Sequence, residues 1–478
     1  MHSQQDSPHL VKGLGLFSAT AIVMGSMIGS GIFIVPAEMS RTLGSPALLI
    51  AAWLLTAFMT LVGALSYGEL AAMMPKAGGQ YVYLREALGP VWGFLYGWTL
   101  FLVIQTGTIA AVAVAFGKFL GVFAPGISQQ HWIAHWGQGS VGLNTANLVA
   151  IVVILFLSWL NTQGVKLGAA VQNIFTSAKV LALLGVIAVG LVARNAAAIH
   201  ANFGAAFWAN AGWKAQHAVR VGSNGPEALV GVFTVLAVVQ VGSLFSSDAW
   251  NNVTFTAGEI TNPKRNLPLS LALGTGVVLA LYIGCNLVYL SVLPLGAIAT
   301  APQDRVATAV MQVAFGPAGA KLMAAAILIS TFGCVNGLLL AGARVYYAMS
   351  CDGLFFAATG RLDARSGAPR NALWLQCLWA CLLCLSGQYG NLLDYVIFAV
   401  LLFYVLTIIG LFRLRKTRPE APRPYRAFGY PLLPGFYIVI AAFICGVLLR
   451  YKPQYTWPGV GIVLLGLPVY ALWRRRFV

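Results

Sequence analysis

The stretch Met24-Gly25-Ser26-Met27-Ile28-Gly29-Ser30-Gly31 decides how this chain folds. It lies inside an apolar run from about Phe17 to Ala37, which is long enough to cross a lipid bilayer. Three glycines and two serines occupy its centre, where glycine weakens a helix and allows the backbone to unwind. Unwound backbone at membrane depth is tolerated only where it is buried in protein or lines a water-filled cavity. The segment is therefore predicted to cross the membrane and to open into a site near its midplane.

The composition of the whole chain indicates an integral membrane protein. Of its 478 residues, 59% are hydrophobic and only 9% are charged, and the mean hydropathy is +0.81. Soluble domains carry about 25% charged residues, so this composition argues against a water-soluble globule. Apolar runs of about 20 residues predict twelve membrane spans. The spans are expected near residues 17–38, 46–74, 91–124, 147–164, 168–194, 228–257, 267–295, 318–349, 371–386, 391–412, 431–449 and 457–473.

The net charge of +17 is distributed unevenly between the two sides of the predicted membrane. If the N-terminus is cytoplasmic, nineteen Lys and Arg residues fall on the inward side and nine on the outward side, while Lys179 lies within the fifth span. Because positively charged loops stay in the cytoplasm, this bias predicts a multi-pass protein of the cell membrane with both termini cytoplasmic. The basic residues are interpreted as determinants of topology in the lipid bilayer, and no nucleic acid is expected as a partner.

Residue types typical of metal, redox or catalytic sites are present without the neighbours that such sites need. Cys381 and Cys384 have the spacing of a redox or zinc motif, but they lie within the ninth span beside no polar residue. His131 and His135 have the spacing of two metal ligands, but no third ligand accompanies them. We therefore expect no metal, no cofactor and no enzymatic activity.

A second interruption occurs at a corresponding place later in the chain. The sixth span contains small and polar residues between Gly242 and Asp248, at the centre of an apolar run. Broken helices in corresponding positions of two repeats indicate the binding site of a transporter. Two ordinary glycine-containing helices that pack closely are the alternative. We predict one all-α membrane domain over residues 1–478, with one repeat at about 15–194, an inverted repeat at about 228–412 and two additional helices at about 431–473.

Several motifs resemble those of the amino acid–polyamine–organocation superfamily. Gly25–Phe33 resembles its first-helix signature, and Tyr67–Leu70 with Pro75–Glu86 resembles the end of its second helix and the following loop. Asp248–Asn252 and Gly258–Pro268 are similar to the L-amino acid transporter branch. The resemblance implies an amino acid substrate and the leucine-transporter fold, in which helices 1 and 6 are broken and two helices follow the ten core helices.

The breaks also suggest how an amino acid zwitterion is held. N–H groups near Gly29, Ser30 and Gly31 begin the second half of the first span, where free amides and the helix dipole suit a carboxylate. Carbonyl groups near Met24–Ser26 and Gly242–Ser243 end the half-helices before the breaks and suit an ammonium. The candidate substrate-binding residues are Ser26, Met27, Gly29, Ser30, Gly31, Gly242, Ser243, Phe245, Ser246 and Asp248. Since a β-branched side chain would fill the space of the ligand, Gly31→Val is expected to abolish binding in a folded protein.

Three further side chains have expected roles near these breaks. Phe245 sits just past the predicted second break, and the resemblance implies an aromatic gate over bound substrate, with a core aromatic as the alternative. Asp248 could meet the ammonium of the substrate or cap the second half of the sixth helix. Glu69 lies near the inward end of the second span and is expected to link helices.

Lys179 lies deep in the fifth span, about 16 Å from its predicted start near Gly168. The resemblance implies the fifth-helix lysine of sodium-independent members, whose ammonium stands where sodium binds in relatives. The carbonyl end of the first half-helix and Ser330 on the eighth span are its expected partners, and together Lys179 and Ser330 are the candidate coupling residues.

These observations predict a sodium-independent permease that exchanges neutral amino acids by alternating access. Proton-coupled uptake through Lys179 is the alternative mechanism. A sensor that binds amino acids without transporting them is the alternative from another class, although no signalling domain is evident in the sequence. The predicted site binds the backbone moiety common to all amino acids, so the sequence does not identify the substrate side chain. It does not identify a partner subunit either.

Overall fold

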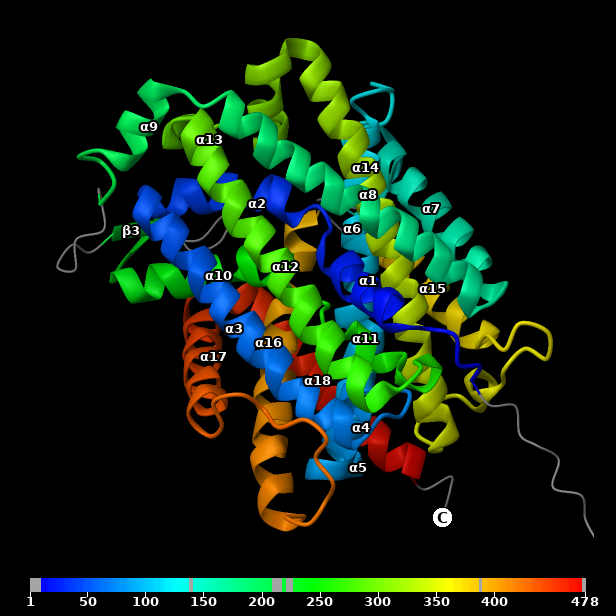
Figure 1. Cartoon of the computed structure of the whole chain (residues 1–478). Helices are drawn as coiled ribbons and strands as arrows, with labels where there is room; N and C mark the ends of the chain where they lie inside the picture. The colour runs from blue at the N-terminus through cyan, green and yellow to red at the C-terminus, as the bar shows by residue number, and fades with distance from the viewer. Residues whose placement is uncertain (1–9, 137–140, 209–216, 221–226, 387–388, 475–478) are drawn as a thin grey trace, which may run out of the picture.

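The computed structural model describes residues 10–136, 141–208, 217–220, 227–386 and 389–474, and helices dominate it (Figure 1). Within these residues, ten helical segments are long and apolar enough to cross a membrane. They are Leu16–Leu43, Pro46–Met73, Pro90–Leu120, Thr145–Thr162, Val165–Val192, Pro263–Val292, Val306–Cys351, Val396–Thr417, Leu432–Tyr451 and Thr456–Trp473. Shorter helices, α10 (Val232–Ser246) and α15 (Arg370–Cys384), lie where the sixth and ninth spans are predicted. Helical segments therefore occur at all twelve predicted positions.

The first span is divided into two helices, as its glycine-rich centre predicts. α1 (Leu16–Met27) and α2 (Gly31–Leu43) are separated by Ile28–Ser30, a segment that we call the first break. The backbone leaves the helix at Ile28, where φ is −76° and ψ is 91°. All residues of the first break are buried, so the unwound backbone is surrounded by protein at membrane depth.

The sixth span is also divided, but its break lies later than predicted. α10 continues through Gly242 to Ser246, and α11 (Asn252–Phe255) begins only after Ser247–Asn251, the second break. The prediction that the helix ends at Gly242–Ser243 is wrong because Gly242 serves close packing. A Cβ on Gly242 would lie 2.6 Å from Val35 Cγ1 of α2.

Two other spans depart from a simple helix. A π-helical turn, η1 (Leu100–Ile104), joins α5 (Pro90–Thr99) to α6 (Gln105–Leu120) in the third span. Such turns inside helices are frequent at functional sites. The eighth span, α14 (Val306–Cys351), begins twelve residues earlier than predicted and bends at Gly316, where φ is +58°.

The other elements complete the bundle and its connections. The remaining helices are α3 (Pro46–Met73), α4 (Gln80–Leu88), α7 (Thr145–Thr162), α8 (Val165–Val192), α9 (Ala196–Phe203), α12 (Pro263–Val292), α13 (Leu295–Ala299), α16 (Tyr389–Thr417), α17 (Leu432–Tyr451) and α18 (Pro453–Arg474). Short 3₁₀ turns are η2 (Ala257–Glu259), η3 (Pro302–Asp304) and η4 (Ala357–Gly360). Two small antiparallel hairpins pair β1 (Trp132–His135) with β2 (Gly142–Asn144) and β3 (His217–Arg220) with β4 (Glu227–Val230).

The packing of the helices places both breaks inside the bundle. α1 packs against α8, α12 and α14, and Figure 1 shows it between α12 and α8. α10 packs against α2, and α3 packs along α12. The first and second breaks are therefore brought together by helices from both halves of the chain.

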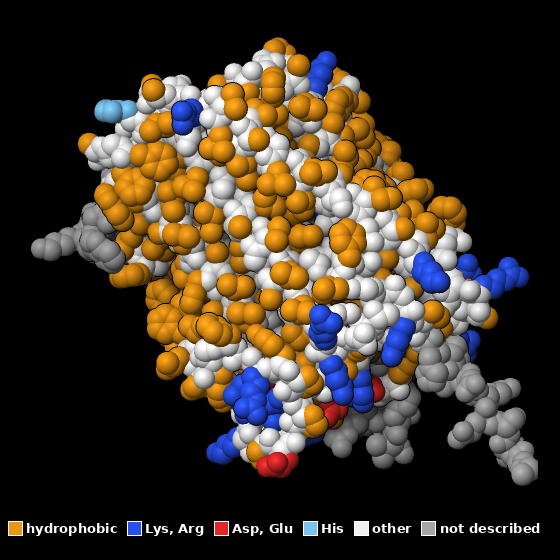
Figure 2. All heavy atoms as spheres, in the orientation of Figure 1, with side chains coloured by type: hydrophobic (Ala, Val, Ile, Leu, Met, Phe, Trp, Pro, Cys, Tyr) orange, Lys and Arg blue, Asp and Glu red, His pale blue; other side chains and the backbone are white. Residues whose placement is uncertain are grey.

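The surface is divided between apolar and cationic regions. Large apolar side chains are exposed on α7 and α8, among them Trp159, Ile174 and Leu181. Figure 2 shows apolar side chains over most of the visible face, while Lys and Arg gather at its lower end. An exposed apolar surface of this extent indicates contact with a membrane.

Both ends of the described chain lie at the same end of the bundle. Leu10 lines a cavity together with Cys351 and Asp352, at the C-terminal end of α14. Trp473, near the end of α18, lies with its ring 5.1 Å from that of Phe356, which follows α14. The segments that enter and leave the bundle therefore share one side.

Candidate functional site

The first break is held by a buried lysine from α8. Lys179 lies midway along this helix and is only 1% exposed. Its ammonium donates to the carbonyl oxygens of Gly25 and Ile28, both at 2.8 Å. Carbonyls at the end of a helix lack intrahelical donors, and a charged donor makes about twice as strong a hydrogen bond as a neutral one. The structure therefore places Lys179 at the carbonyl end of the first half-helix, as predicted, while its role in coupling stays a prediction.

α14 supplies two more donors to the same turn. Ser330 Oγ lies 3.1 Å from Ile28 O, and Cys334 Sγ lies 3.1 Å from Ser26 O. Ser330 thus shares an acceptor carbonyl with Lys179. The two predicted coupling residues therefore meet at Ile28 O, and the role of Ser330 in coupling stays a prediction.

A tyrosine that the sequence did not single out connects the two breaks. Tyr282 of α12 places its hydroxyl 3.1 Å from Met27 O and 3.0 Å from Ser246 O. These carbonyls belong to the last residues of α1 and α10. Since a tyrosine hydroxyl has a single proton, it donates fully to only one of them at a time. The carbonyl ends of both half-helices therefore converge on one point.

Most of the carbonyls predicted to receive an ammonium have partners within the protein. Those of Met24–Ser26 accept from the backbone or from the donors of α8 and α14. Gly242 O accepts from Ser246 Oγ at 2.8 Å, and Ser243 O accepts a backbone N–H at 3.1 Å. The prediction is wrong for Gly242 and Ser243, because α10 continues past both residues. Met24–Ser26 do lie in the last turn of α1, and the binding of an ammonium by their carbonyls stays a prediction. The converging carbonyls are those of Met27 and Ser246, which are predicted substrate-binding residues but are not among the carbonyls predicted for the ammonium.

The N-terminus of α2 faces the first break. Ser30 is the N-cap residue and Gly31 is the first residue of the helix. The N–H groups in the first turn of a helix have no intrahelical acceptor, and the helix dipole makes this end partly positive. The arrangement suits a carboxylate, as predicted from the sequence.

The two glycines beside this helix end differ in the space around them. A Cβ on Gly31 would lie 2.9 Å from the backbone Cα of Ser246 on α10. A Cβ on Gly29 would lie 3.4 Å from Cys334 Sγ, which is an ordinary contact. A side chain at Gly31 would have to displace Ser246, so Gly31→Val is expected to disturb the packing of α2 against α10 as well as binding.

The second break is held by aromatic side chains. The ring of Trp250 lies 4.8 Å from that of Tyr67 on α3 and 5.1 Å from that of Tyr404 on α16. The hydroxyl of Tyr404 also donates to Asp248 Oδ1 at 2.6 Å. The N-cap of α11 is Asn251, so Asp248 does not cap this helix and the capping alternative is wrong. Asp248 instead connects the second break, of which it is part, to Tyr404 of α16.

Two further predicted binding residues are placed at the breaks. Phe245 lies in the last turn of α10, before the second break and not past it, and it is 8% exposed. Its role as a gate stays a prediction. Ser26 lies in the last turn of α1, and its buried hydroxyl has no hydrogen-bond partner among the residues that the structure describes.

A buried ion pair holds the segment that follows the second break. Both oxygens of Glu259 accept from Arg344 of α14 at 3.0 Å, and both side chains are 1% exposed. The backbone carbonyl of Glu259 also accepts the N–H of Leu14 at 3.0 Å, just before α1. Arg344 is one of the nineteen basic residues counted on the inward side of the predicted membrane, and its expected place in a loop is wrong, because α14 continues past it to Cys351 and buries it.

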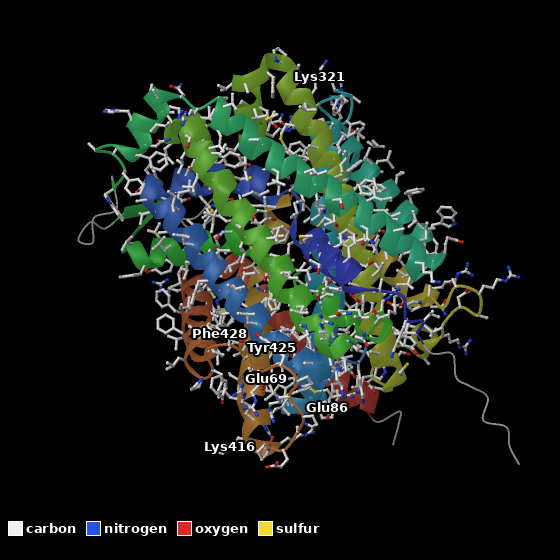
Figure 3. All side chains as sticks on the ribbon, viewed as in Figure 1. Glu69, Glu86, Lys321, Lys416, Tyr425 and Phe428 are labelled. Carbon is white, nitrogen blue, oxygen red and sulfur yellow. The ribbon has the colours of Figure 1, made fainter. Side chains whose placement is uncertain are left out.

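Glu69 links helices as expected from the sequence. Its carboxylate accepts from Arg415 of α16 at 2.6 Å and from the N–H of Ala427 at 2.7 Å. Figure 3 shows Glu69 close to Tyr425, at the same end of the molecule as Glu86 and Lys416. This carboxylate therefore ties α3 to α16 and to the loop that follows it.

Comparisons with known proteins agree with this geometry. Residues 14–467 match the amino acid permease family. The chain is 32% identical to the human large neutral amino acids transporter small subunit 2 over 474 residues, which cover 98% of this chain and 82% of that protein. It is 30% identical to the serine/threonine exchanger SteT of Bacillus subtilis (strain 168) over 478 residues, or 100% of this chain and 99% of that protein. It is 28% identical to the mouse b(0,+)-type amino acid transporter 1 over 471 residues, which cover 97% of this chain and 88% of that protein. This chain, with its divided first and sixth spans, belongs to the amino acid permease family and is a multi-pass membrane protein of the leucine-transporter fold.

Proposed function

We propose that this protein exchanges neutral amino acids across the cell membrane by alternating access and without sodium. The observation that carries the proposal is the meeting of helix ends at the breaks. The N–H groups of α2 lie on one side, and the carbonyls of Met27 and Ser246 converge on the hydroxyl of Tyr282 on the other. Partial positive and partial negative ends at one site complement the carboxylate and the ammonium of an amino acid.

Lys179 supports independence from sodium. Unwound carbonyls at the end of a half-helix coordinate sodium or protons in related transporter architectures. Here the Lys179 ammonium already donates to two such carbonyls, Gly25 O and Ile28 O. A fixed positive charge at this place stabilises the carbonyls that a sodium ion would otherwise coordinate.

The names of the relatives support exchange of neutral amino acids. The human relative is named for large neutral amino acids, and the Bacillus subtilis relative is named an exchanger of serine and threonine. The human name also describes a small subunit. An experiment on this chain alone therefore also tests whether it needs a second subunit.

We infer two inverted repeats, at about 15–194 and 228–412, with both termini in the cytoplasm. A divided helix begins each proposed repeat. The described ends of the chain share one side of the bundle with Lys416, whereas Lys321 lies at the opposite end (Figure 3). The side with more basic residues is the cytoplasmic side of a membrane protein.

Transport by the purified chain in liposomes tests the proposed function. Vesicles loaded with unlabelled alanine should take up labelled alanine, whereas empty vesicles should take up little. Uptake should be equal in sodium and choline buffers. Equal uptake by loaded and empty vesicles would contradict exchange, and a requirement for sodium would contradict the role given to Lys179.

Proton-coupled uptake is the second candidate mechanism. Lys179 is buried next to the backbone that must rearrange during transport, and a buried lysine can exchange its proton when its surroundings change. In this case an inward proton gradient should drive labelled alanine into empty vesicles. Binding of alanine without flux under either condition would instead indicate an amino-acid sensor.

A further inference from the structure

A small polar cavity lies beside the second break. It has a volume of about 10 Å³, which is room for one water molecule. Its lining includes Asp248, Asn252 and Tyr404, together with Thr108 of α6 and Leu338 of α14. A buried cavity with several polar walls is a place where a polar group of a ligand can be received.

This cavity lies about one helical turn from the first break. Val112 of α6 and Cys334 of α14 lie 3.8 Å and 3.4 Å from the position of a Cβ on Gly29. Thr108 and Leu338, which line the cavity, are each four residues from these contacts on the same two helices. Four residues of helix correspond to about 6 Å. An amino acid whose main-chain atoms occupy the breaks therefore reaches the cavity with a short side chain.

Asp248 and Asn252, which line the cavity, both keep hydrogen-bonding capacity for a ligand. Asn252 is 1% exposed, and its Nδ2 has no hydrogen-bond partner within the described part of the chain. Asp248 accepts from Tyr404 at Oδ1, and a carboxylate has about four acceptor positions. By contrast, Gln80 and Asn251 already bind each other at 2.8 Å. A ligand group that both donates and accepts a hydrogen bond would therefore complement Asp248 and Asn252.

We propose that this cavity binds the side-chain hydroxyl of serine or threonine. The hydroxyl would donate to Asp248 and accept from Asn252 Nδ2, and it would take the place of one water molecule. This inference rests on the proposed function, because the main-chain atoms of the substrate must occupy the two breaks. It deepens that function by assigning a preference for small hydroxylated amino acids within the neutral class.

Threonine and valine form the sharpest test of the inference, because they have nearly the same shape and differ in one hydroxyl. A hydrogen bond to a charged group strengthens binding by about tenfold or more, and a site that binds a hydroxyl rejects the analogue without it. We expect the native protein to exchange or bind threonine at least about tenfold better than valine, and serine better than alanine. Alanine has no group that reaches the cavity and serves as the reference substrate.

Two substitutions and one matched control test the assignment of residues. Asn252→Leu should reduce the ratio of threonine to valine exchange about tenfold, and Asp248→Ala should reduce the same ratio, with alanine exchange by each variant measured as the reference. Thr60→Val removes a hydroxyl from a second small cavity, which Asp248 also lines, and should leave the ratio unchanged because Thr60 does not line the first cavity.

The outcomes separate this inference from the proposed function. Absence of alanine exchange by the native protein would overturn the proposed function itself. Alanine exchange with equal use of threonine and valine would overturn the hydroxyl site alone. If a variant loses all exchange, equilibrium binding of threonine and valine to the native protein still decides the question, since equal affinities contradict the proposal.

Discussion

Tyr282 is the residue at which both divided helices meet, since one hydroxyl contacts the last carbonyl of α1 and the last carbonyl of α10. An ammonium has three N–H donors, whereas this hydroxyl has one. Substrate binding can therefore supply further donors to these two carbonyls, although Met27 O also accepts the N–H of Gly29 at 2.9 Å. Tyr282 fixes the distance between these carbonyls and so acts as a positioning residue.

We predict that Tyr282→Phe lowers alanine exchange by about three- to tenfold, because one hydrogen bond of about 1 kcal/mol between the breaks is lost. Tyr289→Phe on the same helix is the control, since its hydroxyl lies 3.4 Å from Ile32 O and contributes a weaker hydrogen bond. Initial exchange rates and alanine affinity measure both effects. Native rates in Tyr282→Phe would contradict a positioning role.

The two glycines at the first break give a second prediction at the scale of residues. Gly31→Ala should lower the thermal unfolding temperature, because its Cβ would lie 2.9 Å from the Ser246 backbone. Gly29→Ala has room for a methyl group and should unfold like the native protein, but it places that group on the ligand-binding turn. We expect it to weaken alanine binding. A stable Gly31→Ala protein would show that α2 and α10 can separate without cost.

At the scale of elements, the short segment after the second break is anchored more firmly than its length suggests. α11 has only four residues, but Glu259 at the end of the following turn, η2, is paired with Arg344 inside α14. Its backbone also pairs with the segment before α1, because the N–H of Thr261 donates to Leu14 O at 2.9 Å. The chain leading into the first span and the chain leaving the sixth are thus joined at one place.

We predict that Glu259→Gln lowers the free energy of unfolding by about 3–5 kcal/mol, because it leaves the buried Arg344 charge without a counter-ion. Glu86→Gln is the matched control: Glu86 pairs with Arg418 at 3.2 Å on the surface, and its loss should cost at most about 1 kcal/mol. Thermal unfolding in detergent measures both.

The double variant Glu259→Leu with Arg344→Leu completes this test. Replacing both members of a buried ion pair with apolar residues is often neutral for stability. We therefore expect the double variant to recover most of the stability that Glu259→Gln loses. A single variant as stable as the native protein would show that the ion pair does not hold the segment.

At the scale of the whole molecule, the bundle surrounds two unwound segments with donors from three different helices. α8 contributes Lys179, α14 contributes Ser330 and α12 contributes Tyr282. These contacts satisfy unwound carbonyls that water cannot reach at membrane depth. Alternating access must exchange some of these contacts, so the lysine that holds the first break connects substrate binding to the movement of the bundle.

We predict that Lys179→Ala abolishes most alanine exchange, because the first break loses its charged donor to Gly25 O and Ile28 O. Lys166→Ala is the control: it removes a lysine from the exposed start of the same helix and should change exchange little. Exchange by the native protein should be the same in sodium and choline. Full activity of Lys179→Ala would contradict its role as a brace.

Local sequence was sufficient for the features that depend on composition and spacing. The apolar runs located all twelve helical positions, because a membrane span needs about 20 apolar residues. The glycines around Ile28 located the first break, because glycine weakens a helix wherever it is placed. Lys179 stands out in the sequence because a charge in an apolar span is costly and needs a partner.

Only the tertiary structure decided the features that depend on contacts between distant segments. Gly242, like Gly29, is a glycine beside a serine at the centre of an apolar run, but it packs against Val35 and the helix continues through it. Tyr282 is one aromatic residue in an apolar helix, and only the packing of α12 brings it to the carbonyls of two other helices. The sequence therefore determined where the backbone could unwind. Packing decided which glycines mark a break, because small residues serve close contact and unwinding equally well. Packing also decided which carbonyls face the binding site.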